Sequence, residues 1–264
     1  MLMVVGGKKM KATIAVLGDT AISKVNQLHT SKSRYLTLTM MAGVFVGFGI
    51  ILIFTIGGLL GPTDFAGTKI IMGVTFGIAL SLVLMAGADL FTSNNMIMTI
   101  GILTKKTTWY ETIQIWTFSY VGNFAGSILV AALFVYSGLA IGGTADYINS
   151  AASAKMNTPF VELLMRGILC NILVCLAVWC AFKLKDETAK LIMIFWCLFA
   201  FITSGFEHSI ANMTLLSLSL MIPHPDTVSL AGMTANLVPV TIGNIIGGAV
   251  FVGAAYWFAN SEKN

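Results

Sequence analysis

The chain has 264 residues, of which 57% are hydrophobic and only 10% are charged, and its formal net charge is +4. Ordinary globular domains carry about 25% charged residues, and several apolar runs here reach the roughly 20 residues that cross a bilayer as a helix. This composition argues against a soluble domain or a nucleic-acid-binding protein and predicts an all-α protein that spans the lipid bilayer.

The first 34 residues form a basic arm ahead of the first apolar run. Nothing in "MLMVVGGKKMKATIAVLG" resembles a cleaved signal, because its apolar pieces are short and interrupted by lysines. We expect this arm, residues 1–34, to be an interfacial helix on the cytoplasmic side. Its basic residues are Lys8, Lys9, Lys11, Lys24, Lys32 and Arg34.

Six apolar segments follow and make up a predicted transmembrane domain over residues 35–259, with a short cytoplasmic tail at 260–264. The second and fifth segments are too long for one simple crossing and contain polar interruptions. The segments run near Tyr35–Leu60, Gly67–Thr104, Thr112–Ile141, Pro159–Phe182, Ala189–Ile222 and Leu230–Ala259.

The basic residues are distributed unevenly between the two sides of these segments. Of the 15 lysines and arginines, six lie in the arm, two follow the second segment, three separate the fourth from the fifth, and one lies in the tail. All of these fall on one side of the predicted topology. The positive-inside rule therefore predicts a multi-pass protein of the cell membrane with both termini in the cytoplasm.

Two pairs of motifs recur at nearly the same offset along the chain. "GNFAG" (Gly122–Gly126) in the third segment matches "GNIIG" (Gly243–Gly247) in the sixth, 121 positions later. Asp89 and Glu207, at the interruptions of the second and fifth segments, are 118 positions apart. Because each half then contains three segments, the second copy enters the membrane from the opposite side, which predicts an inverted 3+3 repeat with broken second and fifth helices.

Polar residues at these interruptions are expected to face the protein interior, because unwound backbone is tolerated in a membrane only where it is buried or lines a cavity. Asn123 and Asn244 are predicted to bond the backbone of the broken segments. For Asp89 and Glu207 we expect a structural role, with each carboxylate accepting bonds from N–H groups freed at a half-helix start. The break near Thr92–Asn95 would present further free N–H groups to an anion.

Five stretches together make the sequence similar to the formate/nitrite transporter family. The resemblance implies an aquaporin-like protomer of six helices, a homopentamer, and one anion path in each protomer, without enzymatic activity or a cofactor. The stretches are "GADLFTS" (Gly87–Ser93), "GNFAG" (Gly122–Gly126), "GILCNILVCLAVW" (Gly167–Trp179), "SGFEHSIANM" (Ser204–Met213) and "NLVPVTIGNIIGG" (Asn236–Gly248).

The same resemblance assigns the residues of the path. The polar lining of the family falls on Thr92, Asn171 and His208, and its pore-facing lysine falls on Lys155. Lys155 precedes the fourth segment on the outer side, where a cation raises the local concentration of anions. The apolar constrictions, which gate by excluding water, fall on Leu80, Leu90, Phe91, Val174 and Phe201.

His208 prompts the main mechanistic hypothesis, because imidazole can hold or lend a proton near neutral pH. The anion of a weak acid would enter the vestibule, share a proton with His208, and pass the apolar ring as the neutral acid or as a strongly hydrogen-bonded pair. The link between "ANMTLLSLSLM" and the last segment favours nitrite as the substrate. Formate and hydrosulfide, both carried by channels of this family, stay open as alternatives.

Other classes of function fit the sequence less well. Water and glycerol channels carry an Asn-Pro-Ala signature at both breaks, and here the breaks read "TSNNM" and "EHSIANM" without proline. A membrane enzyme that used Glu207 and His208 as an acid–base pair is disfavoured, because adjacent helical positions point about 100° apart. A structural or sensing membrane protein remains an alternative. The four cysteines form no CxxC pair, so no metal site is expected.

Overall fold

The computed structural model describes the backbone of residues 2–260 and the side chains of residues 10–260, and within that part every regular element is a helix. Residues 261–264 of the predicted tail, and the side chains of Lys8 and Lys9, lie outside the described part. The elements are α1 (Leu2–Thr30), α2 (Lys32–Leu60), η1 (Gly61–Thr63), α3 (Thr68–Thr75), α4 (Ile78–Met85), α5 (Phe91–Leu103), α6 (Trp109–Tyr136), α7 (Gly142–Met156), α8 (Phe160–Lys183), α9 (Glu187–Thr203), α10 (Ser209–Met221), α11 (Leu230–Ile246), the π-helix η2 (Gly247–Ala254) and α12 (Ala255–Asn260).

These helices follow the six predicted apolar segments, and the second and fifth segments are broken. The second is divided into α3, α4 and α5, with a non-helical stretch at 86–90, and the fifth into α9 and α10, with one at 204–208. Both interruptions are shorter than the stretches predicted from the sequence, Gly87–Asn95 and Gly205–Met213. Thr92–Asn95, expected within the first break, already belong to the first turns of α5.

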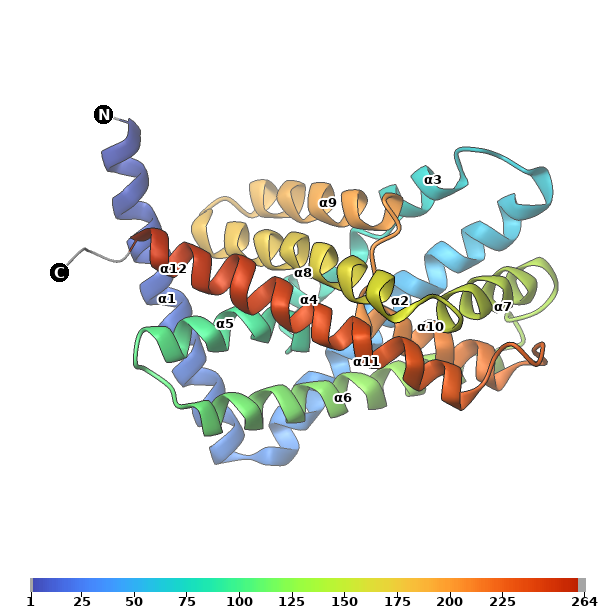
Figure 1. The fold of residues 1–264 in the computed structure, drawn as a ribbon, viewed down its shortest axis with the longest axis horizontal. Helices are drawn as coiled ribbons and strands as arrows, with labels where there is room; N and C mark the ends of the chain where they lie inside the picture. The colour runs from blue at the N-terminus through green and yellow to red at the C-terminus, as the bar shows by residue number, and fades with distance from the viewer. Residues whose placement is uncertain (1, 261–264) are drawn as a thin grey trace.

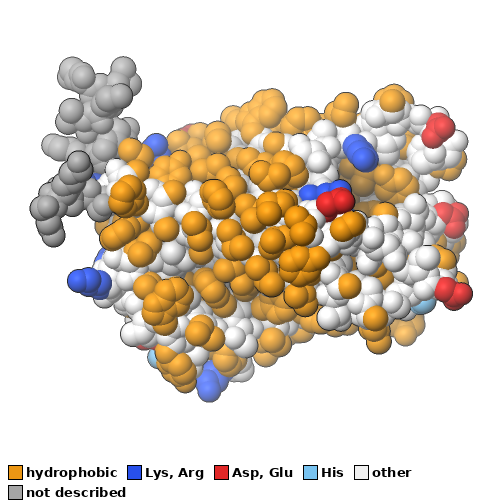
Figure 2. Space-filling view, viewed as in Figure 1, with side chains coloured by type: hydrophobic (Ala, Val, Ile, Leu, Met, Phe, Trp, Pro, Cys, Tyr) orange, Lys and Arg blue, Asp and Glu red, His pale blue; other side chains and the backbone are white. Residues whose placement is uncertain are grey.

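Length and composition fit a membrane environment. Within the described residues, five helical stretches are long and apolar enough to span a bilayer, and α10 is a shorter apolar helix. Figure 2 shows hydrophobic side chains over the middle of the visible face, with most charged side chains toward its two ends. The protein is therefore an all-α membrane protein, as the composition predicts.

The two halves of the chain pack their helices in corresponding pairs around the half-helices α5 and α10. α2 packs along α6 in the first half, and α8 packs along α11 in the second. In Figure 1, α1 and α12 lie at one end of the molecule and α7 lies at the other. We call these ends the α1 face and the α7 face. Between them, nearly every residue of α5 and α10 is buried, including their polar ones.

One element was not predicted from the sequence. The segment between the third and fourth apolar runs forms α7, a helix of 15 residues. Its sequence, "GGTADYINSAASAKM", is small and polar and shows no apolar run that would mark a helix. It packs on α2 at two glycines, where a Cβ on Gly57 would lie 2.2 Å from the ring of Tyr147 and one on Gly58 would lie 2.5 Å from the Cα of Thr144.

The repeated glycines allow the backbones of paired helices to come close together. A Cβ on Gly126 of α6 would lie 2.0 Å from the carbonyl oxygen of Met40 on α2, and one on Gly247 would lie 2.4 Å from that of Ile168 on α8. Real Cβ atoms do not approach a backbone oxygen this closely, so each glycine is required by packing. Small residues at such crossings are typical of helix association in membranes.

This close packing leads to a testable difference between two glycines. Gly126→Ala should destabilise the protein by about 1–3 kcal/mol, since the methyl group forces α2 and α6 apart. Gly77→Ala should change stability little, because its Cβ meets the nearest atom, in Phe195, at 3.7 Å. Thermal unfolding of the two variants in detergent measures the difference. Equal midpoints would contradict the packing argument.

Candidate functional site

Each broken segment turns at a glycine before its second half-helix starts. Gly87 and Gly205 adopt φ values of 79° and 75°, in the left-handed region where other residues are strained. The residue after each glycine donates its N–H to the carbonyl oxygen five positions earlier. Ala88 donates to Val83 at 2.9 Å, and Phe206 donates to Phe201 at 3.0 Å. Both breaks therefore have the same backbone geometry, as the internal repeat predicts.

Asn123 of α6 holds the first break together with three hydrogen bonds. Its Oδ1 accepts from the N–H of Phe91 at 2.8 Å, which is the first residue of α5. Its Nδ2 donates to the carbonyl oxygens of Thr39 at 2.7 Å and of Asp89 at 2.9 Å. The side chain is fully buried, so it replaces water as the partner of an unwound backbone.

Asn244 of α11 makes the equivalent three bonds at the second break. Its Oδ1 accepts from the N–H of Ser209 at 2.9 Å, and its Nδ2 donates to the carbonyls of Gly167 at 2.8 Å and of Glu207 at 3.0 Å. The two asparagines thus bond the backbone of the broken segments, in the manner expected from the sequence.

The structure corrects the expectation for the two carboxylates. The freed N–H groups of Phe91 and Ser209 donate hydrogen bonds to the side-chain oxygens of the two asparagines. The carboxylates of Asp89 and Glu207 accept hydrogen bonds from side chains instead. The reason is their position: the N-cap residues are Leu90 and His208, so each acid lies one residue before the cap.

Asp89 is buried on the side of the α1 face and has three side-chain partners. Lys24 of α1 forms an ion pair with it, Tyr35 donates its hydroxyl at 2.9 Å, and Asn94 donates its amide at 2.6 Å. A buried carboxylate with a cation and two further donors has its charge compensated locally. Asp89 therefore ties α1 and α2 to the first break.

Glu207 has a similar environment toward the α7 face. Lys155 of α7 donates to its Oε1 at 2.6 Å, and Asn212 donates to its Oε2 at 2.6 Å. Asn236 completes this network, because its Oδ1 accepts from Asn212 at 2.8 Å and its Nδ2 donates to the carbonyl of Lys155 at 3.0 Å. Glu207 therefore ties α7 to the second break.

The two ion pairs extend the repeat beyond the predicted three segments. Lys24 on α1 and Lys155 on α7 are 131 positions apart and bind the equivalent acids. α1 is thus the counterpart of α7, and each half consists of a helix at one face followed by its membrane segments. The basic arm is one of the repeated elements, and its residues Leu17, Ala21 and Leu28 are buried against the bundle.

His208 lies at the start of α10 with both ring nitrogens engaged. Nδ1 accepts from the N–H of Ala211 at 3.1 Å, so the ring caps its own helix. Nε2 lies 3.0 Å from Oγ1 of Thr92. Because Nδ1 accepts a hydrogen bond, the proton of the neutral ring belongs on Nε2, and Nε2–H donates to Thr92. The side chains of both residues are buried.

A cavity of about 150 Å³ lies on the α7 side of this pair. Its polar lining residues include His208, Asn212 and Lys155, together with Lys69 of α3. The other lining residues are mainly apolar or aromatic, among them Phe54, Phe201, Phe206 and Tyr147. The cavity is therefore an apolar vestibule with a few polar groups, which is the usual composition of a small-ligand site.

Beyond His208 the interior narrows to a constriction. A second cavity of about 10 Å³, roughly the space of one water, has His208 as its only polar lining residue. Its other lining residues include four of the five predicted constriction residues, namely Leu80, Leu90, Val174 and Phe201. His208 thus lies in the wall of both cavities, between the vestibule and the constriction.

Two predicted path residues lie elsewhere. Phe91 packs edge-on against Tyr120 at 5.1 Å and lines a separate surface pocket between α6 and α11. Asn171 is buried behind Thr92, where its Nδ2 donates to the carbonyl of Thr92 at 3.1 Å and to that of Asn244 at 2.6 Å. Asn171 therefore positions the backbone of the path, and Phe91 does not line the constriction cavity.

Several residues of the site were missed by sequence analysis. Lys24, Tyr35, Asn94 and Asn212 were not singled out, although Asn94 and Asn212 each stand five positions after an acid that was. That repeated acid-to-asparagine spacing was the available signal. Lys24 gives no comparable signal, because it is one of several lysines in a basic arm.

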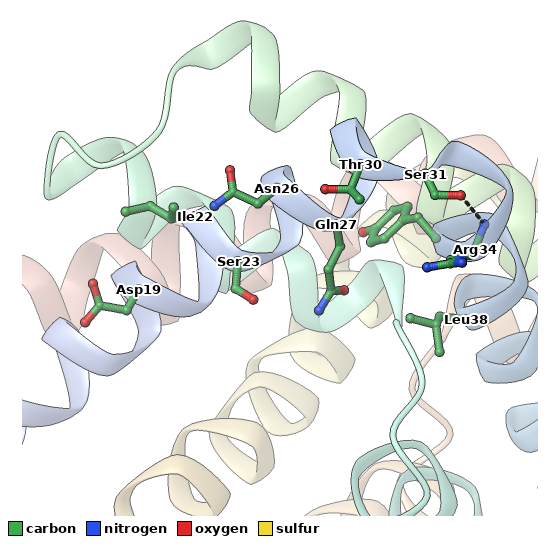
Figure 3. Close-up of a pocket in the computed structure, with 10 residues that line it drawn as sticks. Asp19, Ile22, Ser23, Asn26, Gln27, Thr30, Ser31, Arg34 and Leu38 are labelled. Carbon is green, nitrogen blue, oxygen red and sulfur yellow. Dashed lines mark hydrogen bonds between the residues drawn. The ribbon is translucent and has the colours of Figure 1, made fainter.

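The α1 face carries a larger hollow of about 660 Å³ between α1 and the start of α2 (Figure 3). None of the predicted path residues lines it. Its walls are mostly polar side chains of α1 together with Arg34 of α2, and the labelled residues are Asp19, Ile22, Ser23, Asn26, Gln27, Thr30, Ser31, Arg34 and Leu38.

The hollow is open because the two connecting loops differ in length. On the α7 face, the eight residues at 222–229 fill the corresponding place, where Asn149 donates to the carbonyl of Pro223 at 2.8 Å and Ser153 donates to Thr227 at 2.8 Å. The loop at 104–108 has five residues, and its Lys106 reaches Asp19 at 2.6 Å. It leaves the rest of this α1 surface uncovered.

Among the described residues, no group of three or more His, Cys, Asp or Glu side chains is placed to hold a metal ion. The acids of the site are engaged by lysines and amides instead.

The chain is similar to known proteins over most of its length. The family model described as "Formate/nitrite transporter" matches residues 11–258. The nitrite transporter NirC of Escherichia coli K12 is 45% identical over 225 residues, covering 85% of this chain and 82% of NirC. The formate channel FocA of the same organism is 32% identical over 256 residues, covering 89% of each chain.

Solved structures show the same likeness. A structure described as an "FNT family ion channel" superposes with a TM-score of 0.91 at 40% identity, covering 95% of this chain and 100% of its own. A "Pentameric formate channel with formate bound" superposes with a TM-score of 0.76 at 29% identity, covering 86% of this chain and 96% of its own. The named relatives are transporters and channels.

Proposed function

Because the chain belongs to the formate/nitrite transporter family, we propose that it transports nitrite across the membrane along a path in each protomer that passes His208. The observation that carries this proposal is the vestibule of about 150 Å³ that ends at His208, followed by an apolar constriction of about 10 Å³. A small ion with one charge fits such a path in size.

The choice of nitrite rests on the relatives. The nitrite transporters of Escherichia coli and Salmonella typhimurium are 45% and 46% identical to this chain, whereas the formate channel of Escherichia coli is 32% identical. Formate and hydrosulfide remain the alternatives, because each is also a small monovalent anion of a weak acid and makes the same demands on the site.

An anion cannot cross the constriction bare without a large loss of hydration energy. The Nε2–H of His208 donates to Thr92 in this structure. The same N–H can donate a hydrogen bond to an anion that enters the path. Complete proton transfer from the ring would first require a proton on Nδ1, which would break its bond with the N–H of Ala211. The ion therefore passes as a hydrogen-bonded pair, or as the neutral acid with a proton brought from the vestibule.

Lys155 supports this path by compensating a carboxylate. Glu207 immediately precedes His208, and a free negative charge there would repel the anion. The ion pair of Lys155 with Glu207 at 2.6 Å removes that repulsion while Lys155 still lines the vestibule. The hydroxyl of Thr92 lies next to Nε2 of the His208 ring and provides a second polar group for the anion. In this proposal the constriction acts as a gate that excludes water.

The sequence supports a proposed orientation in the membrane, and a relative supports a proposed assembly. We place the α1 face in the cytoplasm, because the positively charged arm and loops lie on that side. The related formate channel is described as pentameric. We extend that assembly to this chain, so that five protomers would each carry their own path through the bilayer.

Stopped-flow uptake into proteoliposomes tests the proposal. Vesicles with the purified protein should take up nitrite several times faster than formate or hydrosulfide, and faster than protein-free vesicles. If formate or hydrosulfide enters fastest, that anion replaces nitrite as the substrate. If none of the three enters faster than in protein-free vesicles, the transport proposal is wrong.

A further inference from the structure

The vestibule on the α7 face contains two lysines in different electrostatic situations. Lys155 donates to Glu207 at 2.6 Å, so its charge is compensated within the site. Lys69 lines the same cavity, and no ion pair joins it to an acid among the described residues. The side chain of Lys69 is exposed, whereas Glu207 is buried. The uncompensated cation of the vestibule is therefore Lys69.

The other charged side chains at the α7 face are mostly negative or paired, so Lys69 is the positive charge that an anion would meet there. Arg166 and Glu162 of α8, four residues apart on one helix face, pair with each other at 2.7 Å. Three exposed acids remain in the loops and in α7, namely Asp64, Asp146 and Asp226. Figure 2 shows acidic side chains at this end of the molecule. An approaching anion would thus meet a mainly negative surface, with Lys69 as its positive point.

We infer that Lys69 recruits the anion at the α7 face, with Lys155 serving mainly to compensate Glu207. This inference rests on the proposed transport function and assigns its entry step to a residue that neither the motifs nor the repeat had singled out. Lys69 is the second residue of α3, at the start of the broken second segment, and the repeat offset of 118 positions places an acid, Glu187, at the equivalent position at the start of α9.

A charge at the entrance of a path changes how often the substrate reaches the path more than it changes the rate at which the bound substrate crosses. Long-range attraction raises the local concentration of a counter-ion, and salt screens it over about 8–10 Å at ordinary ionic strength. Loss of Lys69 should therefore raise the half-saturating nitrite concentration and leave the maximal rate nearly unchanged. The effect should fade at about 1 M salt, where screening acts within about 3 Å.

The experiment measures nitrite flux in membrane vesicles with the α7 face toward the bath, their sidedness established with an N-terminal epitope tag. Lys69→Gln should reduce flux at low nitrite and low salt about two- to fivefold, and Lys69→Glu should reduce it further. Lys69→Arg should retain the wild-type flux. Lys185→Gln, an exposed lysine between α8 and α9, serves as the matched control and should have no effect.

The outcomes separate this inference from the function on which it rests. If wild-type vesicles carry no nitrite, formate or hydrosulfide, the transport proposal fails first. If wild-type flux is present and Lys69→Gln matches it at low salt, the recruiting role of Lys69 is overturned. A reduction that persists unchanged in high salt, or one confined to the maximal rate, also overturns it, since neither is a steering effect.

Discussion

His208→Asn should leave the protein folded and lower its nitrite flux at least about tenfold. The shorter amide retains an oxygen that can accept from the N–H of Ala211, so the cap of α10 is preserved. It loses the Nε2–H that reaches Thr92 across the path. A hydrogen bond to a charged group contributes about 1.5–3 kcal/mol, and 1.4 kcal/mol is a factor of ten in rate. Stopped-flow uptake across a range of pH measures the loss.

Two companion variants make this result interpretable. His208→Phe removes the cap as well as the donor, so it should lose flux and also about 0.5–2 kcal/mol of stability. Thr92→Val keeps the shape of the side chain and removes its hydroxyl, and it should give a smaller loss of flux. Unchanged flux and an unchanged pH profile in His208→Asn would remove imidazole from the mechanism.

Asn123→Leu is expected to produce a large loss of stability. It leaves three buried backbone groups without partners: the N–H of Phe91 and the carbonyls of Thr39 and Asp89. Each unpaired buried group costs about 1–3 kcal/mol, so the total should be at least about 3 kcal/mol. Thermal unfolding and the yield of monodisperse protein in detergent report the effect.

The repeat supplies the comparison for this prediction. Asn244→Leu should be about as damaging, because Asn244 makes the same three kinds of bond at the second break. Asn157→Leu is the matched control: Asn157 also donates two bonds to carbonyls, but it is exposed, so water can replace it. A similar small effect in all three variants would show that the asparagines do not hold the breaks.

The hydrophobic pattern was enough to predict the helices that cross the membrane, because a bilayer requires long apolar runs. It also located both breaks, since a polar cluster in such a run is costly unless the chain unwinds there. α7 escaped prediction because its stability comes from contacts with Gly57 and Gly58 of α2, and its own sequence carries no apolar stripe. Local sequence gives no signal for a helix that depends on its docking surface.

The site could be predicted where the type of residue determines its role. It could not be predicted where the role depends on the direction in which a side chain points. Thr92 and His208 were expected together, and they lie 3.0 Å apart. Phe91 was expected at the constriction next to Leu90, but successive residues at a helix start point in different directions, and Phe91 faces Tyr120 instead. The cationic partners of the carboxylates come from distant helices, so no spacing along the chain identified Lys24 or the pairing of Lys155 with Glu207.

The equivalence of α1 and α7 bears on the ancestry of the chain. A duplicated unit that already included the helix ahead of its first crossing would account for this equivalence, since α1 and α7 each carry a lysine that pairs with the acid of a break. A single ancestral unit, inserted in the membrane in either direction, would have carried one such helix to each aqueous surface. An N-terminal truncation before Ser31 would therefore delete one of two inherited partners and leave Asp89 without its cation.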